Sequence, residues 1–166
     1  MIQLTAGVFL LATLVVMGCT VGAAPVSSRP VPEAVSLFAG LDCGGAAEEP
    51  GAQWIGDEAG YKVVLGKNMS RQAGGESVDF SRHGVLSIHM GFKATAGFSL
   101  GLASGEVTLD NGTATVRITW NEPPPGALVA QMLTSPCLLV RLPRAGFARV
   151  RVVDQDDRQR MIVDIK

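Results

Sequence analysis

Apolar and polar residues alternate with a period of two along most of the chain after residue 60, and this period is typical of β-strands with one buried face. Leu86, Ile88 and Met90 share one face of such a run, for example. The strand-like runs are residues 61–66, 83–91, 97–103, 108–120, 137–142, 148–153 and 161–165. Residues 35–60 are mixed and rich in glycine, so no long helix is expected there.

A tight turn is predicted inside the run 108–120. Asn111-Gly112 suits a two-residue type I′ turn, which needs positive φ at both positions, so this run is a hairpin. The segment 154–160 is a polar turn between the last two strands, and we expect its aspartates to lie in solvent. Short strands at regular spacing without long amphipathic helices predict an all-β fold, an antiparallel β-sandwich or open barrel of about six to eight strands.

The N-terminal residues are interpreted as a targeting segment. An apolar run ends at Met17-Gly18-Cys19, which resembles a bacterial lipobox, so we expect a signal peptide over 1–18 and a lipid on Cys19. Thr20, rather than aspartate, follows the cysteine and favours the outer membrane, facing the periplasm or the cell surface. An ordinary signal peptide cut near Val21–Ala23, with release into the periplasm, is the alternative. Residues 19–34 are rich in proline and serine and are predicted to form a tether, and residues 35–166 a single domain.

Two further cysteines, Cys43 and Cys137, lie in the predicted domain. In an oxidising periplasm they would be able to pair, and the closed loop would stabilise the fold by about 4 to 5 kcal/mol in the chain-entropy model. Two buried free thiols are the alternative, because spacing alone does not establish connectivity.

Composition and charge argue against several classes of function. The formal net charge of -1 provides no basic field for nucleic acid. No serine-hydrolase elbow, paired-carboxylate or phosphate-loop pattern is present, so we expect no enzyme and no cofactor. His83 and His89 lack the close ligand pairs typical of zinc sites, so no metal is expected. Arg149 and Arg151 would share the exposed face of one strand, either as a docking surface for an acidic partner or as part of a solvated mixed-charge face.

The stretch 78–144 resembles the C-terminal domain of PrcB-type protease complex subunits, small bacterial lipoproteins associated with a subtilisin-like surface protease. The resemblance is carried by residues 78–80, 90–91, 93–99, 136 and 139–143. It implies an accessory, non-catalytic protein that binds or stabilises a protease. The expected partner-binding loop contains Lys93 and Thr95 at its tip, with Gly97 allowing the reversal and Phe98 anchoring the returning strand.

Two alternatives remain open for the loop. Its Thr95-x-Gly97-Phe98 pattern also resembles the inhibitory loop of chagasin-type protease inhibitors, immunoglobulin-like proteins that wedge loops into cysteine proteases. A purely structural envelope lipoprotein, in which the loop is a plain turn, is the third possibility.

Overall fold

A computed structural model describes residues 33–42, 48–69, 77–144 and 146–165. Outside these described residues lie the predicted signal peptide, the predicted tether up to residue 32, and the cysteines Cys19 and Cys43. Within them, no helix is both long and apolar enough to cross a membrane.

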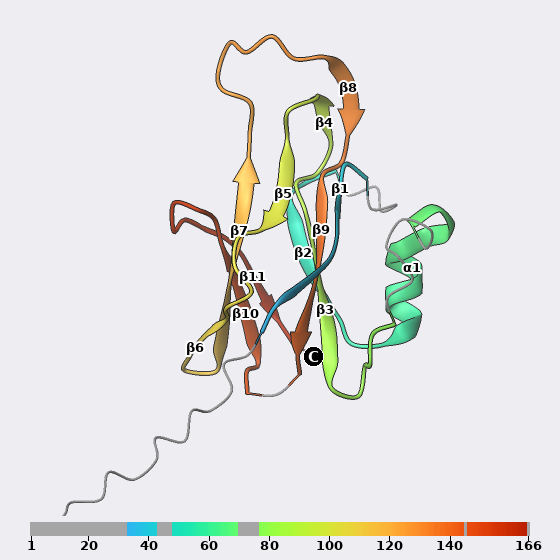
Figure 1. Cartoon of the computed structure of the whole chain (residues 1–166), viewed down its shortest axis with the longest axis vertical. Helices are drawn as coiled ribbons and strands as arrows, with labels where there is room; N and C mark the ends of the chain where they lie inside the picture. Colours follow the sequence, from blue (N-terminus) through green and yellow to red (C-terminus); the bar gives the residue numbers. More distant parts are fainter. Residues whose placement is uncertain (1–32, 43–47, 70–76, 145, 166) are drawn as a thin grey trace, which may run out of the picture.

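Two sheets form the body of the protein (Figure 1). The first has the order β1-β9-β3-β2, all antiparallel, with bounds Val35–Gly40, Cys137–Pro143, His83–His89 and Gly51–Ile55. The second has the order β11-β10-β7-β5, with bounds Gln159–Asp164, Arg149–Val153, Thr113–Asn121 and Ser99–Leu102, and β6 (Thr108–Asp110) also pairs with β7. The prediction of an all-β sandwich is therefore confirmed, with no closed barrel. The pair β7–β10 is parallel, unlike the other strand pairs of the two sheets.

The main core lies between the two sheets and follows the predicted alternation. Leu86, Ile88 and Met90 in and just after β3 are fully buried, as are Val116 and Ile118 of β7. The turn between β6 and β7 has φ 47° at Asn111 and 74° at Gly112, which confirms the predicted hairpin. The period-two pattern therefore identified the inward faces of these strands correctly.

One helix, α1 (Glu58–Met69), covers the outer face of the first sheet. The prediction of a strand over 61–66 was wrong. Asp57 caps the helix, since its side-chain carboxylate accepts the Gly60 amide at 2.7 Å. Tyr61, Val64 and Leu65, at the spacing of one helical face, pack against that sheet. Their burial against the sheet outweighs the strand preference of the local residues.

The turn after β10 also differs from expectation. Asp154 was predicted to lie in solvent with the other aspartates of 154–160, but it is completely buried. Its carboxylate accepts the amides of Asp156 and Arg158 and pairs with Arg160 Nε at 2.7 Å. Burial opposes its ionisation, yet these hydrogen bonds and the Arg160 charge outweigh that cost and hold the pKa of Asp154 below its ordinary value.

Candidate functional site

A two-stranded arm projects from one end of the sandwich (Figure 1). It consists of β4 (Lys93–Thr95), β8 (Gln131–Thr134) and the segment 122–130 that leads into β8. β4 and β8 pair only with each other among the described residues, so the arm forms a small sheet of its own. The predicted loop 92–98 is therefore one side of a larger structure that includes a segment about 35 residues further along the chain.

The four predicted loop residues all lie in or beside β4, with different environments. Lys93 and Thr95 are half-buried, and Lys93 Nζ lies 5.3 Å from the centre of the Phe98 ring. Phe98 packs against the main core. The predicted anchoring of Phe98 fits this packing, which buries part of its ring against the core.

Gly97 has φ 97°, a conformation that residues with a side chain rarely adopt. A Cβ atom there would lie 3.1 Å from Cβ of Pro123 in the proline-rich segment. The amide of Ala96 donates to the carbonyl of Ala130 at 2.9 Å. The two sides of the arm are therefore joined by backbone pairing and by close packing at Gly97.

The arm carries exposed apolar side chains that the sequence analysis did not select. Eight large hydrophobic residues are exposed among the described residues; three of them lie on the arm and a fourth directly precedes β4, so exposure is concentrated there. These are Phe92, Leu128, Met132 and Leu133, with exposed fractions of 41%, 104%, 44% and 73%. Uncovered apolar groups of this kind often mark protein interaction surfaces.

The strand β8 is irregular where two of these residues lie. Lys93 pairs with Thr134 and Thr95 with Gln131, so the single residue Ala94 lies opposite both Met132 and Leu133. Such a bulge changes the direction of side chains and interrupts regular pairing. It explains how two consecutive apolar residues of one strand are both exposed.

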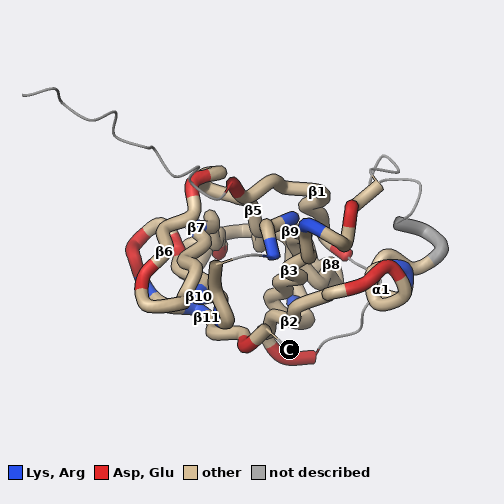
Figure 2. The backbone as a smooth tube through the Cα atoms, turned by 90° about the horizontal axis from the view of Figure 1, so that it is seen from below, with Lys and Arg blue, Asp and Glu red and all other residues tan. Residues whose placement is uncertain are grey.

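The arm is also nearly free of charge. Between Pro123 and Pro136 the sequence has no acidic or basic residue, and Lys93 is the one charged residue of 92–98. Elsewhere along the described backbone both acidic and basic residues occur, as the end view in Figure 2 shows. A partner of the arm would therefore be recognised by apolar contact and backbone hydrogen bonds rather than by charge.

Other candidate residues are placed as follows. Arg149 is exposed and Arg151 half-buried on the outer face of β10, as predicted from their spacing. Cys137 is buried and disulfide-bonded, and the other two cysteines of the chain, Cys19 and Cys43, lie outside the described residues. No group of three metal-binding side chains occurs within the described ranges.

Comparison with known families gives one match. Residues 85–143 match the family model described as PrcB C-terminal, which confirms the resemblance over most of the expected range. The match runs from β3 to β9 and contains both strands of the arm. Comparisons with curated proteins and with solved structures gave no match.

Proposed function

We propose that this chain, whose residues 85–143 match the PrcB C-terminal family, is a non-catalytic subunit that binds a subtilisin-like protease through the arm. The family match suggests association with a protease complex. The observation that carries the proposal is the concentration of exposed apolar side chains on an arm that packs on neither sheet over much of its length. A monomeric protein would gain nothing from exposing these groups, whereas a partner that covers them gains their burial.

The size of this contribution can be estimated from Met132 and Leu133. Full burial of such a side chain is worth about 1.5 to 3 kcal/mol. Their exposed fractions of 44% and 73% leave about 2 to 3.5 kcal/mol available to a partner. Removing both side chains should therefore weaken binding by roughly 20- to 300-fold.

Capture from native cells tests this proposal. The full-length chain with a C-terminal affinity tag is purified from detergent-solubilised envelopes, and bound serine proteases are labelled with a fluorophosphonate probe and identified by mass spectrometry. Met132→Ser/Leu133→Ser tests the arm, and Val63→Ser/Leu109→Ser is the control, because these two exposed residues lie away from the arm. We expect the wild type and the control to retain a labelled subtilisin-like protease and the arm variant to lose it. Equal recovery by the arm variant would contradict the proposal, as would recovery of no labelled protease by the wild type.

The same samples separate an accessory role from inhibition. We propose that the protease keeps its peptidase activity in the complex, because Phe98, the aromatic residue of the chagasin-like pattern, packs against the main core instead of projecting as an inhibitory wedge would. A complex that is inactive until the chain is removed would favour the inhibitor alternative. Inhibition of papain by the purified chain would favour the chagasin-like form of it.

We also propose that the chain is anchored in the bacterial outer membrane through a lipid on Cys19. The support is the lipobox-like Met17-Gly18-Cys19 and the proline-rich residues that follow it. Metabolic labelling with an alkyne fatty acid should mark the wild type but not Cys19→Ser, and the variant should leave the membrane fraction. Equal labelling of the two proteins would contradict acylation at this residue.

A further inference from the structure

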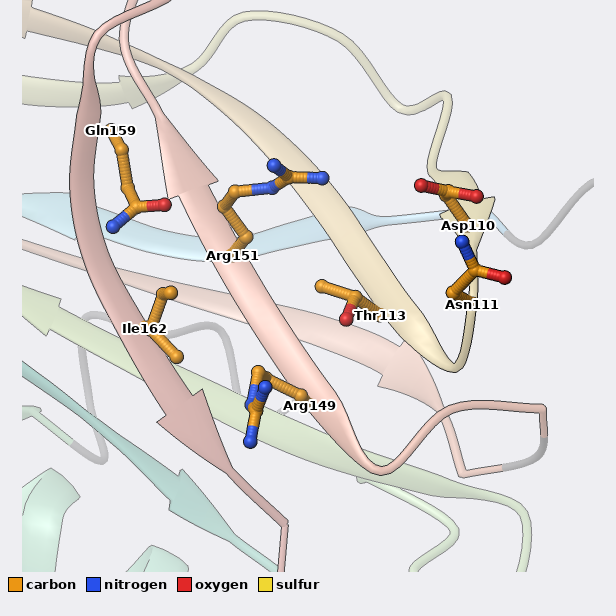
Figure 3. Close-up of a pocket in the computed structure, with 7 residues that line it drawn as sticks. All are labelled: Asp110, Asn111, Thr113, Arg149, Arg151, Gln159 and Ile162. Atoms are coloured by element: carbon orange, nitrogen blue, oxygen red, sulfur yellow. The ribbon is translucent and has the colours of Figure 1, made fainter.

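The outer face of the second sheet contains a hollow of about 260 Å³ that is separate from the arm (Figure 3). Strands β7, β10 and β11 and the turn between β6 and β7 supply its lining. The hollow lies at the Thr113 end of β7, whereas the arm follows the Asn121 end. At about 3.3 Å per residue the two ends are about 25 Å apart, so this surface is independent of the proposed arm contact.

Strand register places two arginines in the hollow. Arg149 lies between Thr113 of β7 and Asp164 of β11, and Arg151 lies between Thr115 and Ile162. The neighbouring residues Val150 and Val152 are completely buried in the core. The alternation along β10 therefore directs both guanidinium groups outward, and Figure 3 shows both beside the hollow.

The two arginines differ in their charge partners. Arg149 Nε donates to Asp164 Oδ1 at 2.8 Å, so its charge is already paired. Arg151 Nε donates to the hydroxyl of Thr115 at 3.3 Å, and within the described part of the chain it has no carboxylate partner. Arg151 is therefore a half-buried cation with a neutral partner, and its terminal nitrogens remain available as donors.

We propose that the hollow binds one carboxylate, presented by an acidic side chain of a partner polypeptide, on the guanidinium of Arg151. A guanidinium donates two parallel hydrogen bonds to a carboxylate, and partial burial strengthens this pair relative to one in open water. The amide of Gln159 and the hydroxyl of Thr113 provide neutral polar lining, and the half-exposed Ile162 provides an apolar surface for the methylene groups of the acid.

Size and charge favour a single carboxylate over other anions. The hollow is smaller than the roughly 300 to 1,000 Å³ of pockets for drug-sized ligands, so it fits one side chain. Asp164 pairs with Arg149, and Asp110 also lines the hollow, so the four charged groups sum to zero and Arg151 is the lining cation without an ion-pair partner among the described residues. A phosphate dianion would be repelled by these two carboxylates, and the single guanidinium of Arg151 would not balance its two charges. A carboxylate carries one negative charge, which Arg151 alone can pair with.

Titration followed by NMR tests the inference. The full-length chain, labelled with 15N-arginine and held in detergent micelles, is titrated with N-acetyl-glutamate N-methylamide, with its neutral glutamine counterpart and with inorganic phosphate. We expect the glutamate probe to shift the Arg151 Nε–Hε resonance saturably with a Kd in the millimolar range, and the glutamine probe to have no such effect. Arg151→Gln lacks this resonance, so its binding is followed by saturation transfer to the glutamate probe, and it should be at least tenfold weaker than that of the wild type in the same assay. Arg117→Gln is the control, because Arg117 lies on the same sheet but pairs with Asp157, and it should leave binding unchanged.

Three results would overturn the inference. Equal shifts with the glutamate and glutamine probes would show that the charge is not recognised. Tighter binding of phosphate than of the glutamate probe would replace the carboxylate with another anion. Saturation of the Arg117 and Arg149 resonances in parallel with Arg151 would show non-specific attraction to the whole face. The comparison of probes on the wild-type chain decides the question even if a variant fails to fold.

Discussion

Asp154 offers a direct test of how the fold holds the end of β7 from which the arm begins. Its carboxylate is completely buried and accepts the amides of Asp156 and Arg158 at 2.9 and 3.0 Å. It also pairs with Arg160, whose guanidinium lies 4.7 Å from the centre of the Trp120 ring. Gln155, in the same turn, exchanges hydrogen bonds with the backbone of Trp120. The turn after β10 therefore fixes Trp120, close to the end of β7 from which the arm begins.

Asp154→Asn keeps the size of the side chain and removes its charge. The amide oxygen can still accept the two backbone amides, but the NH₂ group then faces Arg160, which has only donors. The variant loses one charge-assisted hydrogen bond, worth about 1.5 to 3 kcal/mol, and weakens two others, so we expect a loss of about 2 to 4 kcal/mol in the free energy of unfolding. This corresponds to a fall in Tm of roughly 10 °C for a domain of this size. Asp156→Asn in the same turn is the control, because its carboxylate is 55% exposed and pairs loosely with Arg158 at 3.8 Å.

The pH dependence of Asp154 supplies a second readout. Because its folded pKa lies below the ordinary value of 3.8, the carboxylate stabilises the fold fully above that pH. This contribution is lost as the pH falls through the lower folded pKa. Urea unfolding at pH 7 should therefore separate the wild type from Asp154→Asn, and the difference should shrink below pH 3.8. A variant as stable as the wild type at pH 7, or a difference that is constant with pH, would refute the assigned role of the charge.

Three further predictions follow from other parts of the fold. Gly97→Val should strain the arm by roughly 1 to 3 kcal/mol because φ is 97°, and it should speed hydrogen exchange of the Ala96 amide; unchanged exchange would count against this. Cys137 is disulfide-bonded, and Asp42, which directly precedes Cys43, pairs with Ser135, two residues before Cys137. Peptide mapping without reductant should therefore find Cys137 linked to Cys43, and a link to Cys19 would disprove this. Burial lowers the pKa of His89 below 6.5, so the folded state disfavours the charged imidazole. The free energy of unfolding is therefore highest above pH 6.5, where His89 is neutral, and falls as the pH drops below that value. His89→Gln should flatten this pH dependence between pH 7 and 5, and an unaltered profile would exclude His89 as its cause.

Local patterns predicted the inward faces of the central strands well, and most directly in β7, where one face is buried and the other is partly exposed to water. In β3 and β7 the inward residues are completely buried and the outward residues of β7 are largely polar, so alternation reports the geometry directly. The hairpin turn was equally clear, since Asn111-Gly112 satisfies a backbone requirement that few other pairs meet. Each of these features depends on residues close together in the sequence.

Features that depend on distant segments were not predictable in the same way. The residues of α1 include β-branched Val63 and Val64, which favour a strand locally, and two glycines, which disfavour a helix. Burial of one helical face against the first sheet decides otherwise. The parallel pairing of β7 with β10 joins segments separated by β8 and β9. Asp57 followed by Glu58 is the local sequence signal that marks the start of the helix.

The arm shows why an apolar run does not by itself identify a core strand. Residues 127–133 are almost entirely apolar, a pattern that is equally typical of a buried strand, yet Leu128 and Leu133 are among the most exposed side chains described. The difference arises because β8 pairs with β4 alone in a small separate sheet, whose side chains are not covered by a second layer of the sandwich. The bulge opposite Ala94 also changes the direction of the β8 side chains. An exposed apolar edge strand is a liability for a protein that acts alone, since it invites association. Its lack of charge removes the usual protection of such an edge, and the proposed contact of the arm with a partner would explain why residues that resemble a core strand in the sequence are left exposed.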